Sequence, residues 1–446
     1  MRKNVFRLCS LALFCCPQPP PPMAPQPGKK AQISAASLRP YAIAVRSIEP
    51  TDEDYSDLMP LIDRIGDSRV VVLGEATHNE GTTSRAKARL VRFLHRKMGF
   101  DVLAWESGFV QSYGMNEALR NADVPLDEAK SYLMSGGWAA EEAVHSVFEY
   151  ARDCWSSCRR PLVMAGFDTG RPHKARQYFL QFLTELVSRA PALSLSQEEW
   201  LLIDALVSRG YGFISHEVPD EEQRQRQRDV LDHLLERLRA KRPALLNVLS
   251  QRDLLLAERF VQDALTSEHI KALSGALERN YARDRAMAHT LRWLLDVLYP
   301  DRKIIVWAAT AHFIRNSSLI TNSEHDDWYA VDWEAGNHVY PFLQDDLYTI
   351  AFTAYAGSYG HIFAQGSRAS EVEVMDAAPS GSFEAAAHEL GIEYLFVDLR
   401  SAPRSHPLKE EFTSVSLGRF INSAPWSQIV DAFFFIDKAE PIRYLP

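Results

Sequence analysis

Four short apolar runs of the sequence each lead directly into residues that can perform acid–base chemistry. In chain order, these residues are Glu75 and His78, Glu106, Asp168, and His312. In open α/β sheets, ligands bind just beyond the carboxyl ends of the strands. If the four runs are neighbouring strands, three carboxylates and two histidines converge on one crevice, and we predict a catalytic site there.

A histidine beside a carboxylate is suited to general-base catalysis. The carboxylate holds the imidazole in one tautomer and stabilises the cation that forms when the ring accepts a proton. Glu75 and His78 lie three residues apart and share one face if the following loop begins with a helical turn. Taken singly, each residue is more simply explained as a helix cap, an ion-pair partner or a core histidine. Their coincidence at four strand ends favours a site that activates water.

The same histidines and carboxylates also have the chemistry of a divalent-metal site. The sequence has no H-E-x-x-H motif and no paired C-x-x-C motifs, so spacing does not decide between the two alternatives. Serine-hydrolase chemistry has no support, because no G-x-S-x-G motif is present. Neither a G-x-G-x-x-G motif nor a P-loop occurs, so nucleotide binding has no support either.

The apolar runs that must position these residues predict an α/β fold. Seven runs rich in Val, Ile, Leu and Phe have the length of buried strands. They are Val70–Gly74, Val102–Glu106, Leu162–Gly166, Ile304–Ala308, Tyr348–Thr353, Tyr394–Asp398 and Ala432–Ile436. Helical patterns such as Arg85–Met98 separate the first three runs, and this alternation predicts a mostly parallel central sheet flanked by helices.

The chain divides into three parts. Residues 1–40 form a proline-rich tail, residues 41–173 and 299–446 form the α/β catalytic core, and residues 174–298 form a helical insertion that caps it. The helices expected in the insertion are Tyr178–Ser188, Glu198–Ser208, Glu221–Arg239, Ala244–Leu265 and Asp284–Leu298. Four aromatic residues of this cap are candidate walls of a hydrophobic substrate pocket: Trp200, Tyr211, Phe213 and Trp293.

Composition excludes several classes of protein. The 446 residues carry 49 basic and 58 acidic side chains, and the net charge of −9 excludes a generally basic nucleic-acid binder. With 46% hydrophobic and 24% charged residues, the chain is neither disordered, collagen-like nor a coiled coil. No apolar run approaches the ~20 residues of a transmembrane helix, so we expect a soluble body.

The N-terminal tail has two interpretations that the sequence leaves open. Basic residues precede the apolar stretch Leu8–Cys16, and the proline-rich segment Pro17–Pro27 follows it. This order is typical of a secretory signal with a tether to the membrane or envelope. The alternative is a disordered extension of a cytoplasmic protein, so both locations remain open.

Only two of the five cysteines, Cys154 and Cys158, lie outside the tail, at the end of the expected helix Val144–Cys158. Two cysteines are not a disulfide framework, and no histidine is near them in sequence. We therefore expect ordinary, partly buried thiols.

Motifs spread from Tyr41 to the C-terminus resemble the erythromycin esterase family. They are G-E-A-T-H at Gly74–His78, K-A-R-L at Lys87–Leu90, G-F-D at Gly166–Asp168, R-D-R-A-M-A at Arg283–Ala288, V-W-A at Val306–Ala308 before His312, A-G-S at Ala356–Ser358, and G-S-F-E at Gly381–Glu384. The resemblance implies a metal-independent hydrolase, without cofactor, that opens the lactone ester of a macrolide antibiotic and so confers resistance.

Carried over by position, the resemblance makes His78 the general base, with Glu75 and Glu106 orienting the imidazole and the water. His312 corresponds to the second histidine of the family's W-A-H-N-x-H segment. The substrate-binding residues that we expect from the matching motifs are Lys87, Arg89, Asp168 and Arg283. For Arg283, the simpler alternative is a buried ion pair with Asp284 or a neighbouring carboxylate.

The chain also departs from the family pattern. Ala309 and Thr310 stand where members usually carry histidine and asparagine, and Thr290 stands where they usually carry asparagine. If the missing histidine stabilises an oxyanion, its loss costs on the order of 10²–10³-fold in rate unless another donor, such as His289, replaces it. We predict hydrolysis of a hydrophobic ester or lactone. The alternatives are a metal-dependent hydrolase, or a non-catalytic ligand-binding relative linked to envelope polysaccharide synthesis.

Overall fold

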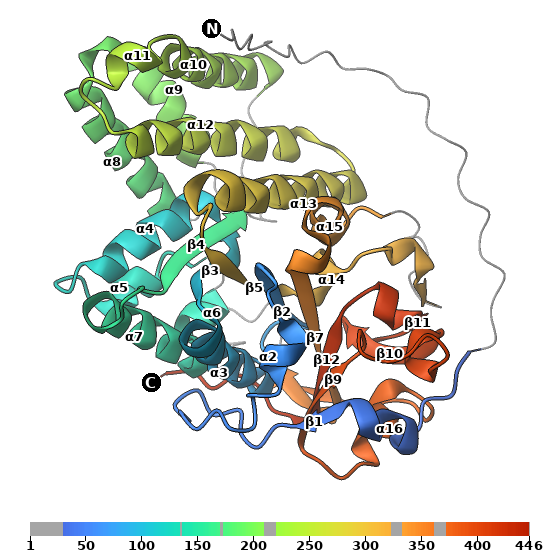
Figure 1. Ribbon diagram of the computed structural model, residues 1–446. Coiled ribbons are helices and arrows are strands. Elements are labelled where there is room, and N and C mark those ends of the chain that lie inside the picture. The colour runs from blue at the N-terminus through green and yellow to red at the C-terminus, as the bar shows by residue number, and fades with distance from the viewer. Residues whose placement is uncertain are drawn as a thin grey trace, which may run out of the picture.

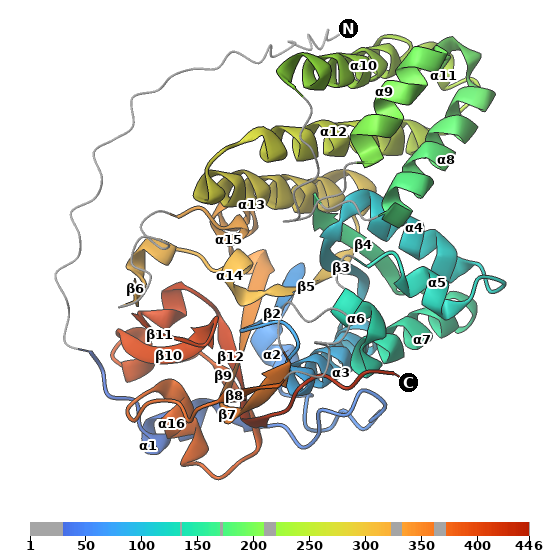
Figure 2. The ribbon, with the colours of Figure 1, turned by 180° about the vertical axis from the view of Figure 1, so that it is seen from behind.

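The computed structural model describes residues 30–133, 136–169, 173–208, 220–322, 332–360 and 372–445 (Figures 1 and 2). Most of the expected tail lies outside these residues, and so do Tyr211 and Phe213 of the expected cap. The last part of the expected tail is folded: Ala35–Leu38 forms helix α1, and Ile33 and Leu38 are buried. No helix in the described part of the chain is long and apolar enough to cross a membrane.

The centre of the molecule is a mostly parallel sheet, which confirms the predicted α/β fold. Nine strands of the described chain build it in the order β1-β9-β12-β7-β2-β5-β3-β4, with β8 paired to β7. The strands from β12 to β4 are parallel to one another, and antiparallel pairs occur at β1–β9, β9–β12 and β7–β8.

All seven predicted apolar runs are strands of this sheet. Their bounds are Val70–Glu75 (β2), Phe100–Gly108 (β3), Val163–Asp168 (β4), Lys303–Ala309 (β5), Leu347–Gly360 (β7), Tyr394–Asp398 (β9) and Ala432–Ala439 (β12). Two short strands of the sheet were not predicted, Ala42–Ala44 (β1) and Val372–Met375 (β8). Neither has a run of buried apolar residues, because each pairs at the margin of the sheet.

The central strands are apolar throughout because both faces of the sheet are covered. Side chains of a strand alternate between its faces. Val70 and Val72 of β2 pack into one core with the helical block, whereas Val71 and Leu73 pack into a second core on the opposite face. Beneath that second face lie α2 (Leu61–Ile65), α3 (Gly81–Met98), α5 (Leu126–Lys130) and α7 (Glu142–Ser157).

The described residues of the helical block, 173–208 and 220–298, are almost entirely helical, in agreement with the predicted helical pattern. The helices are α8 (His173–Arg189), α9 (Gln197–Ser208), α10 (Glu221–Ala240), α11 (Arg242–Leu245), α12 (Gln251–Ala272) and α13 (Ala276–Trp293), and the last continues into a turn at Leu294–Leu298. Figures 1 and 2 show α8–α12 gathered at one end of the molecule, with α13 lying between them and the sheet.

One prediction in this block is wrong. The expected single helix Ala244–Leu265 is two helices, α11 and α12, because Ser250 caps the second one. The Ser250 hydroxyl accepts the backbone N–H of Asp253, and the Asp253 carboxylate accepts the backbone N–H of Ser250. This capping box is favoured at a helix start and interrupts an otherwise continuous apolar pattern.

The remaining elements complete the sheet's surroundings. Helices α4 (Phe109–Arg120) and α6 (Gly136–Ala140) follow β3, and α14 (Thr310–Phe313), α15 (Ala335–Leu343) and α16 (Phe383–His388) follow β5 or β8. An unpredicted antiparallel sheet lies beside them, with strands Thr321–Asn322 (β6), Phe412–Leu417 (β10) and Phe420–Ala424 (β11).

The expectation of two ordinary thiols is also wrong. Cys154 and Cys158 form a disulfide in the structure, at the end of α7. Residues four apart lie on the same face of a helix, so the last turn of α7 presents both sulfur atoms on one side. Nothing in the sequence favoured this pairing over two free thiols.

Candidate active site

Glu75 and His78 are held together at the carboxyl end of β2. Glu75 is the last residue of the strand, and His78 lies in the turn that leads to α3. The His78 Nδ1 atom lies 2.9 Å from Glu75 Oε1. A carboxylate oxygen can only accept, so Nδ1 carries the hydrogen and Nε2 carries the lone pair. Glu75 therefore fixes the tautomer that can accept a proton.

Lys87 holds Glu75 from the other side. Its ammonium donates to Glu75 Oε2 and lies 3.4 Å from the carbonyl oxygen of Ala308. It also lies 4.4 Å from the centre of the Trp307 ring. The Lys87 side chain is fully buried, so it does not line the cleft as predicted. Its position makes it an anchor for Glu75.

His78 is the most exposed titratable group of the cluster, with 39% of its side chain accessible to solvent. The Trp138 ring packs edge-on against the imidazole, with ring centres 5.3 Å apart, and restricts its rotation. Partial burial of the imidazole lowers the pKa of His78, and the charges of His312 and Arg283 lower it further. The charge of Glu106 acts in the opposite direction. His78 is therefore neutral at pH 7 and open to a water molecule.

Glu106, near the end of β3, joins three partners. Its Oε1 accepts from Arg283 at 2.9 Å and lies 3.2 Å from His312 Nε2, while its Oε2 accepts the backbone N–H of Ala309 at 2.9 Å. Burial acts to raise the pKa of Glu106, but the charges of His312 and Arg283 outweigh it and hold that pKa well below its usual range. Glu106 is therefore a carboxylate at neutral pH.

His312 is held between two carboxylates. It lies on α14, the short helix after β5, and its Nδ1 is 2.9 Å from both oxygens of Asp284 while its Nε2 faces Glu106. Both ring nitrogens thus face acceptors, and only the imidazolium can donate to both. Burial acts to lower the pKa of His312, but the charges of Asp284 and Glu106 raise it to about 10. The two histidines are in opposite protonation states.

Arg283 of α13 connects the helical block to the sheet. Its Nε and Nη2 atoms bind both oxygens of the fully buried Asp168, at distances from 2.6 to 3.1 Å, and Nη2 also binds Glu106. The next residue, Asp284, accepts the backbone N–H of Ala335 at the start of α15. Successive residues of α13 therefore bind β3, β4, α14 and α15.

The end of β5 lies between the two halves of this cluster. In the sheet, β5 pairs with β2 on one side and with β3 on the other. The carbonyl of Ala308 faces Lys87, and the N–H of Ala309 faces Glu106. The order β2-β5-β3-β4 thus brings Glu75, Ala309, Glu106 and Asp168 to adjacent strand ends, as the sequence predicted for the carboxylates.

Close packing at Gly74 holds β2 against α14. A β-carbon at Gly74 would lie 2.7 Å from the Thr310 hydroxyl and 2.9 Å from its α-carbon. We expect Gly74→Ala to lower the free energy of unfolding by about 1–3 kcal/mol, as overpacked cores do, and to displace α14, which carries His312. Urea denaturation measures the loss. The control is Gly275→Ala, where the nearest atom is 3.4 Å away, and an equal loss in both variants would contradict the packing argument.

The structure brings together all but one of the predicted site residues. The cluster contains Glu75, His78, Lys87, Glu106, Asp168, Arg283 and His312. Arg89 does not join it, because its guanidinium binds Asp57 with two bonds of 2.8 Å together with backbone carbonyls of the loop before it. Arg89 therefore fastens that loop to α3 and has no donor left for a substrate.

The contacts of Asp284 and Glu334 were not predicted from the sequence. Asp284 was considered only as an ion-pair partner of Arg283, and it binds His312 instead. Glu334 precedes α15 and accepts from the Ser317 hydroxyl at 2.7 Å. Burial and the charge of Asp284 raise the pKa of Glu334 to about 8, so it is protonated at neutral pH. The signal for Asp284 was its place beside Arg283, whereas Glu334 had no signal.

The positions that depart from the family pattern do not restore the missing imidazole. Ala309 contributes only its backbone N–H, and Thr290 binds Arg259 and the carbonyl of Ala286. His289 is exposed and shares its surroundings with Arg285 and His338, so it does not reach the cluster. The predicted wall residues Trp200 and Trp293 pack against the core of the helical block.

The donor set fits a metal ion poorly. The candidate ligands were Glu75, His78, Glu106 and His312, and three of them already have partners: the two carboxylates bind cations, and His312 donates both ring N–H groups to carboxylates. Lys87 binds Glu75, and Arg283 binds Glu106. Among the described residues, one group has ligand atoms close enough to share an ion, and it is elsewhere: His95, Cys154 and Cys158.

Comparisons with known proteins identify a matching family, related sequences and a related fold. A sequence model of the family described as erythromycin esterase matches residues 95–439. The Bacillus subtilis (strain 168) protein named "Putative hydrolase YbfO" is 26% identical over 372 residues, 79% of this chain and 78% of that protein. The Escherichia coli protein named "Erythromycin esterase type II" is 23% identical over 408 residues, 87% of this chain and 94% of that protein.

A solved structure has the same fold. It is that of a mutant of the erythromycin esterase EreC in its open conformation, and it superimposes with a TM-score of 0.66 at 18% sequence identity. The alignment covers 90% of this chain and 98% of that one. The likeness therefore spans the parallel sheet and the helical block together.

Proposed function

The chain belongs to the erythromycin esterase family, and on that premise we propose that it hydrolyses a carboxylic ester or lactone with a water molecule activated by His78. One observation carries the proposal. Glu75 fixes the tautomer of a neutral, accessible His78, while Asp284 and Glu106 keep the second histidine, His312, protonated. A base and a cation in one cluster are what the addition of water to a carbonyl requires.

In the first step, His78 Nε2 removes a proton from water, and the water oxygen forms a bond with the carbonyl carbon. Glu75 stabilises the resulting imidazolium through Nδ1–H. The Glu106 carboxylate favours the same transfer, because its charge raises the pKa of His78.

In the second step, the carbon–oxygen bond of the tetrahedral intermediate breaks, and the proton on His78 passes to the leaving alkoxide. The positive charges of His312 and Arg283 stabilise the negative oxygen of that intermediate. Their positions are fixed by Asp284, Asp168 and Glu106 before substrate binds. The protein therefore spends little free energy on reorienting them during the reaction.

The pH dependence of kcat/KM follows from the two histidines. His78 must be neutral, and because its pKa is lowered from 6.5, activity rises with pH on the acid side below that value. His312 must stay protonated, so activity falls as pH rises through about 10. We expect a broad plateau between these limbs in a pH–rate profile, measured with one ester and corrected at each pH for its uncatalysed hydrolysis. A single limb near pH 6.5 and no basic limb would contradict the assignment of His312.

Aromatic side chains beside the cluster support a hydrophobic substrate. Trp138 packs against His78, and Tyr281, two residues before Arg283, packs against Trp333 with ring centres 5.3 Å apart. A panel of aryl esters, simple lactones and macrolide lactones tests the substrate class. Because Ala309 supplies no side-chain donor, we expect esters with good leaving groups to be cleaved faster than macrolides. Macrolides cleaved as fast as aryl esters would contradict this role for the missing imidazole.

A further inference from the structure

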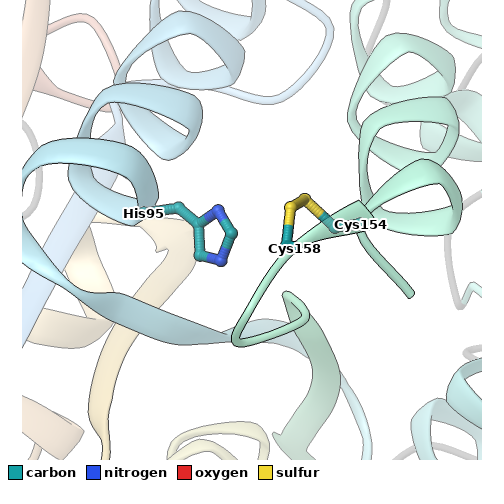
Figure 3. Close-up of side chains that lie close together, drawn as sticks. All are labelled: His95, Cys154 and Cys158. Atoms are coloured by element: carbon teal, nitrogen blue, oxygen red, sulfur yellow. A yellow bond between two sulfur atoms is a disulfide. The ribbon is translucent and has the colours of Figure 1, made fainter. Parts of the chain in front are cut away.

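A second cluster of reactive side chains lies near the amino ends of the strands, whereas the catalytic residues lie at their carboxyl ends. His95 is in the last turn of α3, and Cys154 and Cys158 are at the end of α7 (Figure 3). The helix α3 begins after β2, near His78, and ends before β3 begins. His95 is therefore near the amino ends of the strands, about four helical turns along α3 from the catalytic loop.

The three residues have the geometry of shared ligands. One ligand atom from each, an imidazole nitrogen and two sulfurs, lies within 4.8 Å of the other two. Tyr150 and Cys154 are four residues apart on α7 and share one of its faces, and Cys158, four residues further on, directly follows the helix. Figure 3 shows the His95 ring and both sulfur atoms directed into the same space between the two helices.

The hydrogen bonds of His95 place the lone pair of its ring on Nδ1, the nitrogen that faces the two cysteines. Its Nε2 lies 2.9 Å from the carbonyl oxygen of Arg160, which can only accept, so Nε2 carries the hydrogen. Its Nδ1 then has the lone pair, directed at the same face of α7, where it accepts from Tyr150 at 2.6 Å. Ligating histidines commonly donate their other N–H to a backbone carbonyl in this way.

An open cavity adjoins the two cysteines. Both line a space of about 630 Å³, together with three arginines, Arg92, Arg96 and Arg152, and three acidic residues, Glu53, Glu149 and Asp153. The thiolate is the form of cysteine that binds metals. The cavity is also large enough to admit water, which supplies a fourth ligand in many three-residue sites.

We propose that the reduced form of this cluster binds Zn²⁺ through Cys154, Cys158 and His95 Nδ1. Reduction by an external dithiol breaks the sulfur–sulfur bond, leaves two thiols on α7, and converts the dithiol to its own disulfide. Zinc then displaces the two thiol protons and the Tyr150 hydroxyl. Two sulfurs and one imidazole form a donor set that zinc prefers over calcium or magnesium.

Zinc and the disulfide exclude each other at this site, because the same two sulfurs make either bond. The ion would fasten α3 to α7, whereas the disulfide closes only the last turn of α7. Since the cluster is remote from His78, the inference concerns the stability of the fold and does not depend on the proposed hydrolysis. The test therefore reads metal binding and not turnover.

The experiment uses the full chain with Cys9, Cys15 and Cys16 changed to serine, so that the tail cannot bind metal. Reduced, metal-free protein is titrated with Zn²⁺ by calorimetry and with Co²⁺ by absorption. We expect one ion per chain, a cobalt–thiolate charge-transfer band, and a higher Tm with zinc. The oxidised protein is expected to bind none, since its sulfurs are bonded to each other.

Two variants assign the ligands in that background. Cys154→Ser with Cys158→Ser is expected to abolish binding and the cobalt band, and His95→Ala is expected to abolish tight binding. His145→Ala, one histidine of α7 outside the cluster, is the matched control and is expected to bind as the parent does. Failure of the reduced parent to bind, or binding that survives either variant, would overturn the proposal. A metal at the catalytic histidines would give no thiolate band.

Discussion

Replacing His78 with alanine lowers kcat for ester hydrolysis by about 10²–10⁴-fold, the usual contribution of a general base. The variant has no group to take the proton from water, while Glu75 keeps its ion pair with Lys87. Because 39% of the His78 side chain is exposed, its removal opens no core cavity. KM and the melting temperature are therefore expected to change little. Steady-state kinetics with an aryl ester, together with thermal unfolding, measure both quantities.

The matched control is His289→Ala on α13. His289 is exposed and lies outside the cluster, and from the sequence it was a candidate to replace the missing imidazole. Its kcat is expected to equal that of the parent. Equal activity of His78→Ala and the parent would end the assignment of the base. A large loss in His289→Ala would show that the exposed face of α13 takes part in the reaction.

Changing Asp284 to asparagine lowers kcat by about 10²–10³-fold once the pH exceeds the lowered pKa of His312, the cost of losing a preorganised cation at a developing oxyanion. Asparagine keeps the size of the side chain but removes the negative charge beside His312 Nδ1. That charge is a principal reason why the pKa of His312 reaches about 10. In the variant the pKa falls, and the imidazolium is lost within the working pH range.

The pH–rate profile distinguishes this effect from simple misfolding. Loss of a negative charge lowers the pKa of His312, so the basic limb moves from about 10 toward neutral pH. The acid limb, which reports His78, is expected to stay in place. Asp284→Glu restores the charge and is expected to return the basic limb toward its original position. A basic limb that does not move in the asparagine variant would contradict the role of the Asp284–His312 pair.

The sequence predicted the positions of the strands well because the central strands are covered on both faces. Such strands are continuous apolar runs, so the residue that follows each run lies at the carboxyl end of a strand. This is why Glu75, Glu106 and Asp168 were found from the sequence. The edge strands β1 and β8 and the small sheet of β6, β10 and β11 lack such runs, so nothing marked them.

Contacts between distant elements were not readable from the sequence. Lys87 and Arg89 are two residues apart on α3, and both were expected to bind substrate. The helix directs Lys87 toward Glu75 and Arg89 toward Asp57, so neither side chain reaches the cleft. The partner of Asp284 was likewise hidden, because His312 is on a different helix that follows β5. His95 and the two cysteines were separated by more than 50 residues.

A single-turnover reaction in ¹⁸O-labelled water tests the central claim most directly. Chelator-treated enzyme in excess is mixed with an ester or lactone that the substrate panel shows to be cleaved, and mass spectrometry locates the label. Direct attack by water that His78 activates predicts one ¹⁸O atom in the first carboxylic acid product and none in the protein. An unlabelled first product with ¹⁸O in Glu75 or Glu106 would mean that a carboxylate is the nucleophile. No turnover above the His78→Ala variant would mean that the cluster is not a hydrolytic site.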